Sequence, residues 1–325
     1  MTAAIVTVLG PLPPAQLGFC QSHEHISAAC AHLRAHSPGL VIDDEQRTLT
    51  DLLAYRRAGG QALVDAQPLG AGRDARALVS LSRASGVHVV ASTGFHLPRH
   101  YPDNHWVHTL PQQALQALFT DELTRGMYLD GDEAPPARQG EARAGQVKAA
   151  LEPGPLTGRQ GVRFAAAAGA AIAAGAPLMV HIEPRTDPLA LADFLAGQGL
   201  DLTRAVFCHM DRATPDLVVH RALCERGITL EYDTIARPKY HDDAREAEIF
   251  RHMLRAGYGN RLLAGLDVTR LRLTGYGGTP GLAGLLQNFV PLLRDAGVTE
   301  AQITQIFVEN PARIFQMRPT IQIEE

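Results

Sequence analysis

The basic structural unit of this chain is clearest in PLMVHIEPRTDPLALADFLAGQGLDLTRAVFCHMD (177–211). Two apolar runs, PLMVHIE (177–183) and AVFCHMD (205–211), flank a helix-like segment, PLALADFLAGQG (188–199). Continuously apolar runs of this length are typical of strands that are buried on both faces of a parallel sheet. The stretch therefore predicts a strand, a helix and a second, parallel strand.

Similar runs recur along the whole chain, with amphipathic or alanine-rich stretches between them. The eight runs are LGFCQS (17–22), QALVDAQ (61–67), VHVVAST (87–93), GQVKAAL (145–151), PLMVHIE (177–183), AVFCHMD (205–211), GITLEYD (227–233) and RLLAGLD (261–267). Several helix-like stretches end at a glycine in the C-cap position, namely Gly86, Gly175, Gly227 and Gly257. Eight such units without a linker are best closed into a (β/α)₈ TIM barrel, so we predict one α/β barrel domain over residues 1–325.

Two segments depart from the regular spacing, and the chain ends in a further helical pattern. Residues 96–144 are too long for one loop and contain a helix-like core followed by a polar tail, so we predict an elaborated third loop at the barrel mouth. A glycine-rich stretch, LTGYGGTPGLAGLLQNF (273–289), follows the eighth strand. At the C-terminal end, TEAQITQIFVENPARIF (299–315) predicts a helix-turn-helix.

Composition and charge exclude several classes of protein. The 325 residues carry a net charge of −4, which argues against nucleic acid as a partner because such proteins normally present a basic face. The N-terminus lacks the pattern of a signal peptide, and the longest apolar stretch (164–180) is shorter than the roughly 20 residues of a membrane helix. The four cysteines show no CxxC spacing, which favours buried free thiols. We expect a cytoplasmic protein that does not bind membranes and acts on a small molecule.

Metal-ligating side chains stand where the predicted strands end. In a parallel barrel these ends converge on one site. The candidates are His23 and His25 after the first strand, Lys148 on the fourth, His181 on the fifth, His209 on the sixth and Asp267 on the eighth. Imidazole and carboxylate ligands suit Zn²⁺, Mn²⁺ or Co²⁺, and four histidines with one aspartate are enough for two ions. A single histidine is weak evidence, but five candidate ligands at equivalent positions are hard to explain by chance.

Lys148 is the unusual member of this set. An ammonium group would be repelled by two metal ions, and a desolvated lysine loses its proton readily. A neutral amine can capture CO₂ and form a carbamate, a carboxylate that is able to bridge both ions. The alternative is a barrel lysine that pairs with an acid such as Glu152.

The motifs resemble those of the phosphotriesterase-related proteins of the amidohydrolase superfamily, which include phosphotriesterases, phosphotriesterase-like lactonases and phosphotriesterase homology proteins. The matching motifs are GFCQSHEHI (18–26), ASTGFH (91–96), GQVKAAL (145–151), PLMVHIEP (177–184), AVFCHMDR (205–212), LLAGLDVTR (262–270) and FVENPARIF (307–315). The resemblance implies an amidohydrolase-type barrel with a binuclear metal centre, zinc being the expected metal, and a homodimer. It also counts against the TatD-like nucleases, which share the HxH opening but use a carboxylate on the fourth strand.

The resemblance further implies how the ligands are shared. His23, His25 and Asp267 would hold the buried ion, His181 and His209 the exposed ion, and carbamylated Lys148 would bridge the two. The expected reaction is hydrolysis by metal-bound hydroxide without a covalent intermediate. Asp267 would take the proton of the hydroxide and return it to the leaving group. Glu24 alternates with the two histidines and is expected to face a supporting layer.

Substrate choice is expected to depend on the loops after the seventh and eighth strands. TIARPKYHDD (234–243) carries Arg237 and Lys239, and LDVTRLRLTGYGG (266–278) carries Arg270 and Tyr276. These side chains could clamp a substrate phosphate or carboxylate, and relatives that hydrolyse phosphorylated sugar lactones use a lysine, an arginine and a tyrosine from these loops. The alternative is that they are solvated rim charges that pair with Asp242, Asp243 or Glu246.

We therefore predict a binuclear-metal lactonase or carboxylic-ester hydrolase that acts on an anionic sugar lactone. A phosphorylated sugar lactone is one candidate substrate. One alternative is an amidase that acts on an N-acylated small amine or amino acid. A promiscuous organophosphate triesterase is a further alternative, although the chain contains a single tryptophan and such pockets are aromatic. A non-catalytic barrel homologue is disfavoured because every ligand position is filled.

Overall fold

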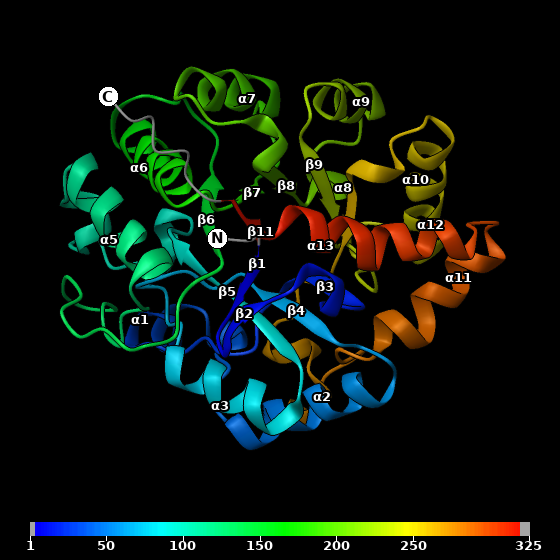
Figure 1. Cartoon of the computed structure of the whole chain (residues 1–325), viewed down its shortest axis with the longest axis horizontal. Helices are drawn as coiled ribbons and strands as arrows, with labels where there is room; N and C mark the ends of the chain where they lie inside the picture. Colours follow the sequence, from blue (N-terminus) through cyan, green and yellow to red (C-terminus); the bar gives the residue numbers. More distant parts are fainter. Residues whose placement is uncertain (1–3, 319–325) are drawn as a thin grey trace.

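The computed structural model describes residues 4–318, and its core is a barrel of eight parallel strands encircled by helices (Figure 1). Each strand pairs with the next along the chain, from the first to the eighth. The strands are β3 (Cys20–Glu24), β4 (Ala62–Asp65), β5 (His88–Gly94), β6 (Gln146–Leu151), β7 (Leu178–Ile182), β8 (Ala205–Cys208), β9 (Thr229–Tyr232) and β10 (Leu262–Ala264). All eight fall inside or next to the predicted runs, and the TIM-barrel prediction is confirmed.

Contacts between the first and last strands bring the two ends of the sheet together. The Ser22 hydroxyl donates a hydrogen bond to the carbonyl oxygen of Ala264 at 2.8 Å, and the amide of Asp267 donates to the carbonyl oxygen of His23 at 2.9 Å. These bonds carry the barrel around to near closure and place Asp267 directly beside His23.

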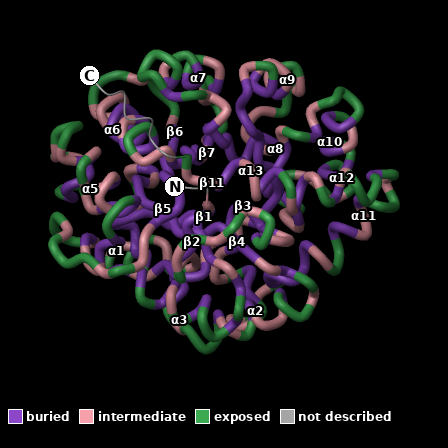
Figure 2. Tube along the Cα trace, viewed as in Figure 1, coloured by how far each residue is buried: buried purple, intermediate pink, exposed green. Residues whose placement is uncertain are grey.

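The helices cover the outside of the barrel, and Figure 2 shows the strands buried while the outward faces of the helices are exposed. Aspartates accept hydrogen bonds from first-turn amides at the starts of several helices, and Gly86 and Gly175 end two of them in the left-handed conformation. The helices are α1 (Ala31–His36), α2 (Glu45–Arg57), α3 (Ala75–Ser85), α4 (Trp106–Thr109), α5 (Gln112–Thr124), α6 (Gly158–Ala174), α7 (Pro188–Gly197), α8 (Met210–Ala213), α9 (Leu217–Glu225), α10 (Asp243–Arg255), α11 (Val290–Asp295), α12 (Glu300–Thr304) and α13 (Asn310–Ile314).

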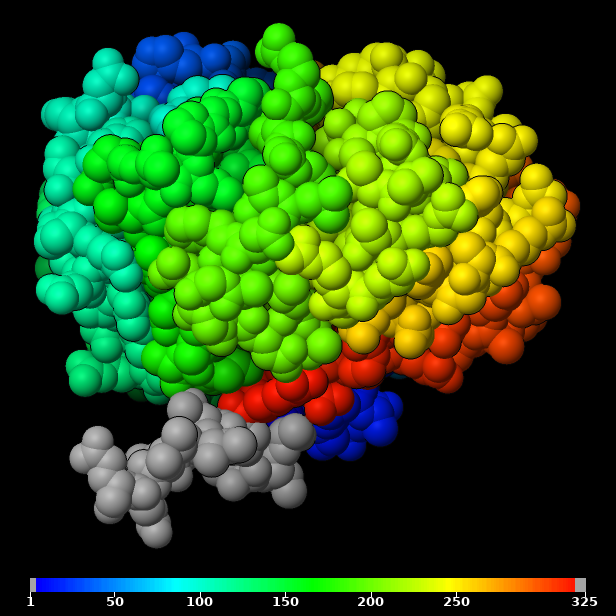
Figure 3. Space-filling model, turned by 90° about the horizontal axis from the view of Figure 1, so that it is seen from above, coloured from blue at the N-terminus to red at the C-terminus, as the bar shows by residue number. Residues whose placement is uncertain are grey.

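A small antiparallel sheet lies near the amino ends of the barrel strands. It consists of β1 (Ala4–Thr7), β2 (Gly10–Leu12) and β11 (Gln316–Met317), and Figure 3 shows the N-terminal and C-terminal segments side by side at this end. Ile5 and Phe315 pack into one apolar cluster with strand residues such as Val64 and Val206. The cluster fills the barrel near the amino ends of its strands. A cavity for a functional site is therefore expected at the carboxyl ends.

The C-terminal segment differs from the predicted helix-turn-helix. Residues 300–314 form one continuous helix, in which a π-helical stretch, Gln305–Glu309, joins α12 to α13. Proline lacks an N–H group, and its ring clashes with the preceding turn of an α-helix. The π turn just before Pro311 is wider than an α turn, so it makes room for the ring and the helix continues without a break. The same arrangement occurs at Leu285–Phe289, just before Pro291.

Within residues 4–318, no helix has both the length and the hydrophobicity needed to cross a membrane. The four cysteines are free and buried, as the sequence predicts.

The segment 96–144 contains α4, α5 and an isolated bridge between Tyr128 and Gln139. A buried ion pair anchors it to the barrel, because the Arg73 guanidinium donates two hydrogen bonds to the Glu122 carboxylate at 2.8 and 2.6 Å. Arg73 also donates to the carbonyl oxygens of Ser92 and Tyr128. Both charged groups are fully buried.

Glu122→Ala should lower the free energy of unfolding by about 3–5 kcal/mol, because it leaves the buried Arg73 charge without a partner. Chemical denaturation measures this loss. Glu300→Ala is the matched control, since it removes an acid from a surface pair with Arg294 and should leave stability nearly unchanged. Equal losses in the two variants would contradict an anchoring role for the buried pair.

Candidate metal centre

His23, His25 and Asp267 meet at the carboxyl end of the barrel. One ligand atom from each lies within 4.8 Å of the other two, and Oδ1 of Asp267 is 3.4 Å from Nε2 of His25 and 3.8 Å from Nε2 of His23. The Glu24 carboxylate accepts the amides of Leu266 and Val268 at 2.7 and 3.1 Å, on either side of Asp267. Glu24 therefore faces away from the candidate ligands and positions one of them.

His181 and His209 form a second group beside the first. Nδ1 of His181 lies 2.7 Å from Nε2 of His209. The other nitrogen of each ring meets a carboxylate, Glu183 at 2.6 Å and Asp233 at 2.5 Å. Nη2 of Arg212 also lies 2.8 Å from Nδ1 of His209, so in the neutral ring this nitrogen can accept from the guanidinium while Nε2 donates to Nδ1 of His181. A cation bound by both rings would take the place of this hydrogen bond.

Lys148 lies between the two groups and is fully buried. Its Nζ atom is 3.2 Å from Nε2 of His23, and within residues 4–318 it forms no ion pair with a carboxylate. Glu152, the alternative partner, instead lies 3.4 Å from Arg163. The imidazoles and the carboxylate among the six side chains form a donor set that fits a divalent metal ion.

Glu231 and Asp233 support the histidines from below, although the sequence analysis did not select them. Oε2 of Glu231 is 3.2 Å from Nδ1 of His23, and Oδ2 of Asp233 is 3.5 Å from the same atom. Such contacts orient a ring and leave its Nε2 free for a metal. The signal in the sequence is LEYD (230–233), where two acids alternate along a predicted barrel strand.

Burial and nearby charges prepare these groups for metal binding. Burial lowers the pKa of His23 and His209 well below the usual value for histidine, so both rings are neutral at pH 7. Burial alone would raise the pKa of Asp267, but Arg237 and the neighbouring histidines lower it well below its usual range. His23 and His209 therefore face the centre as neutral imidazoles, and Asp267 faces it as an ionised carboxylate.

A cavity of about 490 Å³ opens above these groups, and His23, His25, His181 and Asp267 line its floor. Ala28, Leu33 and Leu40 form an apolar wall, whereas other walls are polar. The polar wall residues are His96, Arg99, His100, Arg212, Arg237 and Tyr240. Arg212 and Arg237 donate hydrogen bonds to Oδ2 of Asp267 at 3.0 and 2.9 Å. Positive charge thus lies directly over the candidate ligands.

Of the four side chains expected to bind a substrate anion, the structure brings Arg237 into the cavity. Arg270 instead donates to Val41 and Asp43 at 3.0 and 3.1 Å, because this segment supplies its nearest carboxylate. Tyr276 exchanges hydrogen bonds with the backbone of Asp44. Lys239 is exposed, with its ammonium 4.6 Å from the centre of the Tyr240 ring. Arg270 and Tyr276 therefore tie the eighth loop to the segment after the first strand.

Arg212 and Arg99 are cavity residues that the sequence analysis did not assign to the site. Arg212 is the last residue of the motif AVFCHMDR and lies three positions after His209. Because α8 begins directly after His209, residues three positions apart are neighbours and the Arg212 side chain lies next to this histidine. Arg99 lies at the rim and pairs with Glu183 at 3.1 Å. No pattern in the sequence distinguishes it from a solvated arginine.

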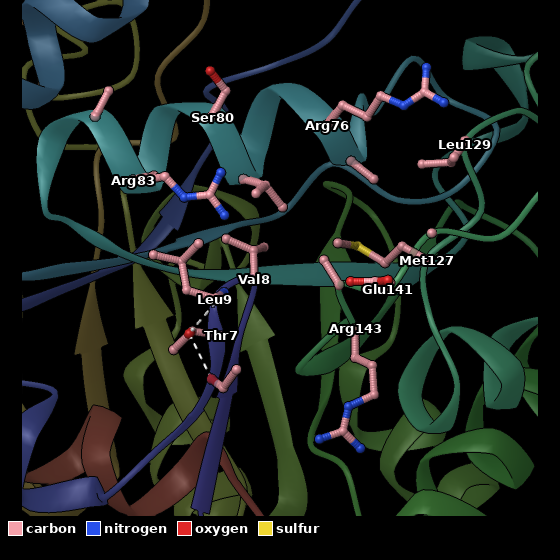
Figure 4. A pocket seen from close by; sticks show the side chains of 16 residues that line it. Thr7, Val8, Leu9, Arg76, Ser80, Arg83, Met127, Leu129, Glu141 and Arg143 are labelled. Carbon is pink, nitrogen blue, oxygen red and sulfur yellow. Dashed lines mark hydrogen bonds between the residues drawn. The ribbon is translucent and has the colours of Figure 1, made fainter.

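A larger cavity, of about 840 Å³, lies between α3, the β1–β2 hairpin and residues 127–143 (Figure 4). Its lining includes Arg76, Arg83 and Arg143 but none of the candidate metal ligands. Size alone therefore does not identify the functional site.

Comparison with known proteins agrees with this geometry. The sequence model of the Phosphotriesterase family matches residues 3–315. The chain belongs to this family. It is 28% identical over 319 residues to a phospho-furanose lactonase of Mycoplasmopsis synoviae (strain 53), with 95% of this chain and 90% of that protein covered. It is 26% identical to an N-acetyltaurine hydrolase of Danio rerio, with 95% and 97% covered.

A solved structure, an amidohydrolase from Mycoplasma synoviae, superposes with a TM-score of 0.92 at 26% identity, covering 99% of this chain and 94% of that one. The chain is thus a phosphotriesterase-family hydrolase with candidate metal-binding residues, and the family prediction is confirmed.

Asp233→Asn should weaken metal binding about 10–100-fold, because it removes the carboxylate that holds the ring of His209. Competition with a chromogenic chelator measures the affinity for Zn²⁺. Asp51→Asn is the matched control, since Asp51 is equally buried but binds the amides of Thr274 and Gly275. Unchanged affinity in Asp233→Asn would remove this acid from the metal centre.

Proposed function

We propose that this chain is a metal-dependent lactonase or carboxylic-ester hydrolase that acts on an anionic, phosphorylated sugar lactone. The observation that carries the proposal is the cavity above the candidate ligands, whose walls contain Arg99, Arg212 and Arg237. Each of these arginines already pairs with an acid, Arg99 with Glu183 and the other two with Asp267, but a guanidinium has five N–H donors and can bind a substrate phosphate or carboxylate at the same time.

In this proposal His23, His25 and Asp267 would hold one divalent ion, and His181 and His209 would hold a second. The amine of Lys148 would combine with CO₂ and lose one proton, and the resulting carbamate would supply a carboxylate ligand shared by the two ions. Zn²⁺ best suits this set of nitrogen and oxygen ligands, with Mn²⁺ or Co²⁺ as substitutes. When bound, such ions polarise a carbonyl oxygen and activate a water molecule.

The protein's own groups then control the proton and the substrate. Asp267 is ionised, so its carboxylate can accept a proton from the attacking water and deliver it to the leaving oxygen. Arg212 and Arg237 orient this carboxylate through Oδ2. The same guanidinium groups face the cavity and can bind the anionic end of a substrate.

The names of the two relatives support an anionic substrate. A phospho-furanose carries a phosphate, and N-acetyltaurine carries a sulfonate, so both substrate types combine an anion with a carbonyl group. The second name favours an alternative function, an amidase that acts on an N-acylated small amine. Organophosphate triesterase activity is a weaker alternative, because within residues 4–318 Tyr240 is the one Phe, Tyr or Trp side chain that lines the cavity.

A kinetic panel tests the proposal. Protein loaded with Zn²⁺ or Mn²⁺ in bicarbonate is assayed with phosphorylated and neutral lactones and with N-acetyl amines that bear a sulfonate or carboxylate. The proposal expects the highest kcat/KM for the phosphorylated lactone. Preference for the N-acetyl amines would replace it with the amidase function, and preference for neutral lactones would contradict the anionic substrate.

Arg237→Gln should lower kcat/KM for the phosphorylated lactone about 10–100-fold more than for a neutral lactone of similar size. The comparison is needed because Arg237 also touches Asp267, and that role affects both substrates. Arg270→Gln is the matched control, since it removes a guanidinium that lies outside the cavity. In this variant the ratio of kcat/KM for the phosphorylated lactone to kcat/KM for the neutral lactone should stay near that of the unsubstituted protein. Equal losses on both substrates in Arg237→Gln would leave this residue with a positioning role alone.

Lys148→Ala should lose one of two metal ions per chain and lower activity at least about 10–100-fold, because the bridge is removed. Metal analysis gives the stoichiometry, and a ¹³C-bicarbonate NMR signal reports the carbamate directly. Propionate should restore part of both properties, and Lys148→Glu should retain metal through its own carboxylate. Two ions and full activity in Lys148→Ala would rule out the bridge.

A further inference from the structure

A further group of metal-ligating side chains, separate from the candidate metal centre, lies outside the cavity. Asp211 in α8, Glu246 in the first turn of α10 and His241 in the loop between β9 and α10 each place one ligand atom within 4.8 Å of the other two. Neither the candidate metal centre nor the cavity lining includes any of them. The proposed reaction therefore does not account for this cluster.

The two acids, Asp211 and Glu246, differ in how fully their oxygens are hydrogen-bonded. The Asp211 carboxylate accepts the amides of Asp233 and Thr234 at 2.9 and 2.6 Å. Glu246 is fully buried, its Oε2 atom meets His241, and its Oε1 atom has no hydrogen-bond partner although the Asp211 carboxylate lies close by. An unpartnered carboxylate oxygen in the interior is costly, so it points to a missing positive group.

Within residues 4–318, no lysine or arginine side chain forms an ion pair with either acid, and His241 is the one basic side chain paired with Glu246. Arg212, which follows Asp211 in the chain, is engaged by Asp233 and Asp267. The imidazole of His241 is 16% exposed, which leaves a route from solvent to the cluster. Two carboxylates and one imidazole are a ligand set that suits Zn²⁺, Mn²⁺ or Co²⁺.

We propose that Asp211, His241 and Glu246 form an additional divalent-cation site, separate from the candidate metal centre. The cation would lie among the two carboxylates and the imidazole and would supply the positive charge that the unpartnered Oε1 atom of Glu246 lacks.

The position of the cluster gives the cation a specific effect. The loop between Thr234 and His241 carries Arg237 and Tyr240 into the cavity. Asp211 holds the start of this loop through the Thr234 amide, and His241 ends it one residue after Tyr240. A cation held by both, and by Glu246 on α10, therefore fixes the cavity wall that contains Arg237.

Metal stoichiometry tests the site directly. Chelator-stripped protein is equilibrated with Co²⁺, and the ions bound per chain are counted for the unsubstituted protein, His241→Ala and Glu246→Gln. Both variants should bind one ion fewer and lose one component of the cobalt absorption spectrum. His252→Ala removes an exposed histidine of α10 and is the matched control, which should bind as many ions as the unsubstituted protein.

The double substitution His23→Ala and His25→Ala separates this site from the candidate metal centre. It should keep the ion at Asp211, and the addition of His241→Ala should remove that ion. Equal ion counts in the unsubstituted protein, His241→Ala and Glu246→Gln would show that the acids share only a proton. Should the variants fail to fold, anomalous scattering from cobalt-soaked crystals of the unsubstituted protein decides: a peak among the three side chains supports the site, and its absence overturns it.

Discussion

Buried carboxylates that accept pairs of backbone amides hold the functional end of this barrel together. Glu24 binds the amides of Leu266 and Val268, Asp65 those of Ile26 and Gln67, and Asp211 those of Asp233 and Thr234. Each acid thereby fixes chain segments that leave the carboxyl ends of strands. Each of these bonds gives a buried amide and a buried acid oxygen a partner that the interior would otherwise deny them, so the loops are held before any metal or substrate arrives.

This frame supports strained backbone at two candidate ligands. His209 and Asp267 have φ values of +64° and +49°, a region that side chains other than glycine rarely adopt. Such a conformation costs of order 1–3 kcal/mol and persists only where the surroundings impose it. For Asp267 the surroundings are the Glu24 bonds on either side and its own amide bond to His23. The strain turns both side chains toward the centre of the barrel.

The sequence predicts the barrel and the ligand positions well, because both follow from short-range patterns. Continuous apolar runs mark strands buried on both faces, and parallel strands bring their carboxyl ends together, so His23, Lys148, His181, His209 and Asp267 must converge. The placement of loop side chains depends on distant contacts instead. Arg270 leaves the cavity because Asp43, 227 positions away, supplies its carboxylate, and no local pattern encodes that pairing. The two-residue strand β11 and the continuous C-terminal helix are missed for related reasons, since their bonding is set by the termini packing together and by a π turn ahead of Pro311.

The same barrel interior must serve two opposite requirements. Near the amino ends of the strands, side chains such as Val64, Val206 and Phe315 pack without any polar group to satisfy. Near the carboxyl ends, Lys148, Glu231 and Asp233 are equally buried but charged or polar, and in the low-dielectric interior each is tolerable only beside a group of complementary charge. The acids there meet histidine rings, with Glu231 beside His23 and Asp233 beside both His23 and His209. Oε1 of Glu231 still has no hydrogen-bond partner among the described residues, and a cation that entered from the cavity above would compensate this buried negative charge, since the apolar cluster fills the opposite end.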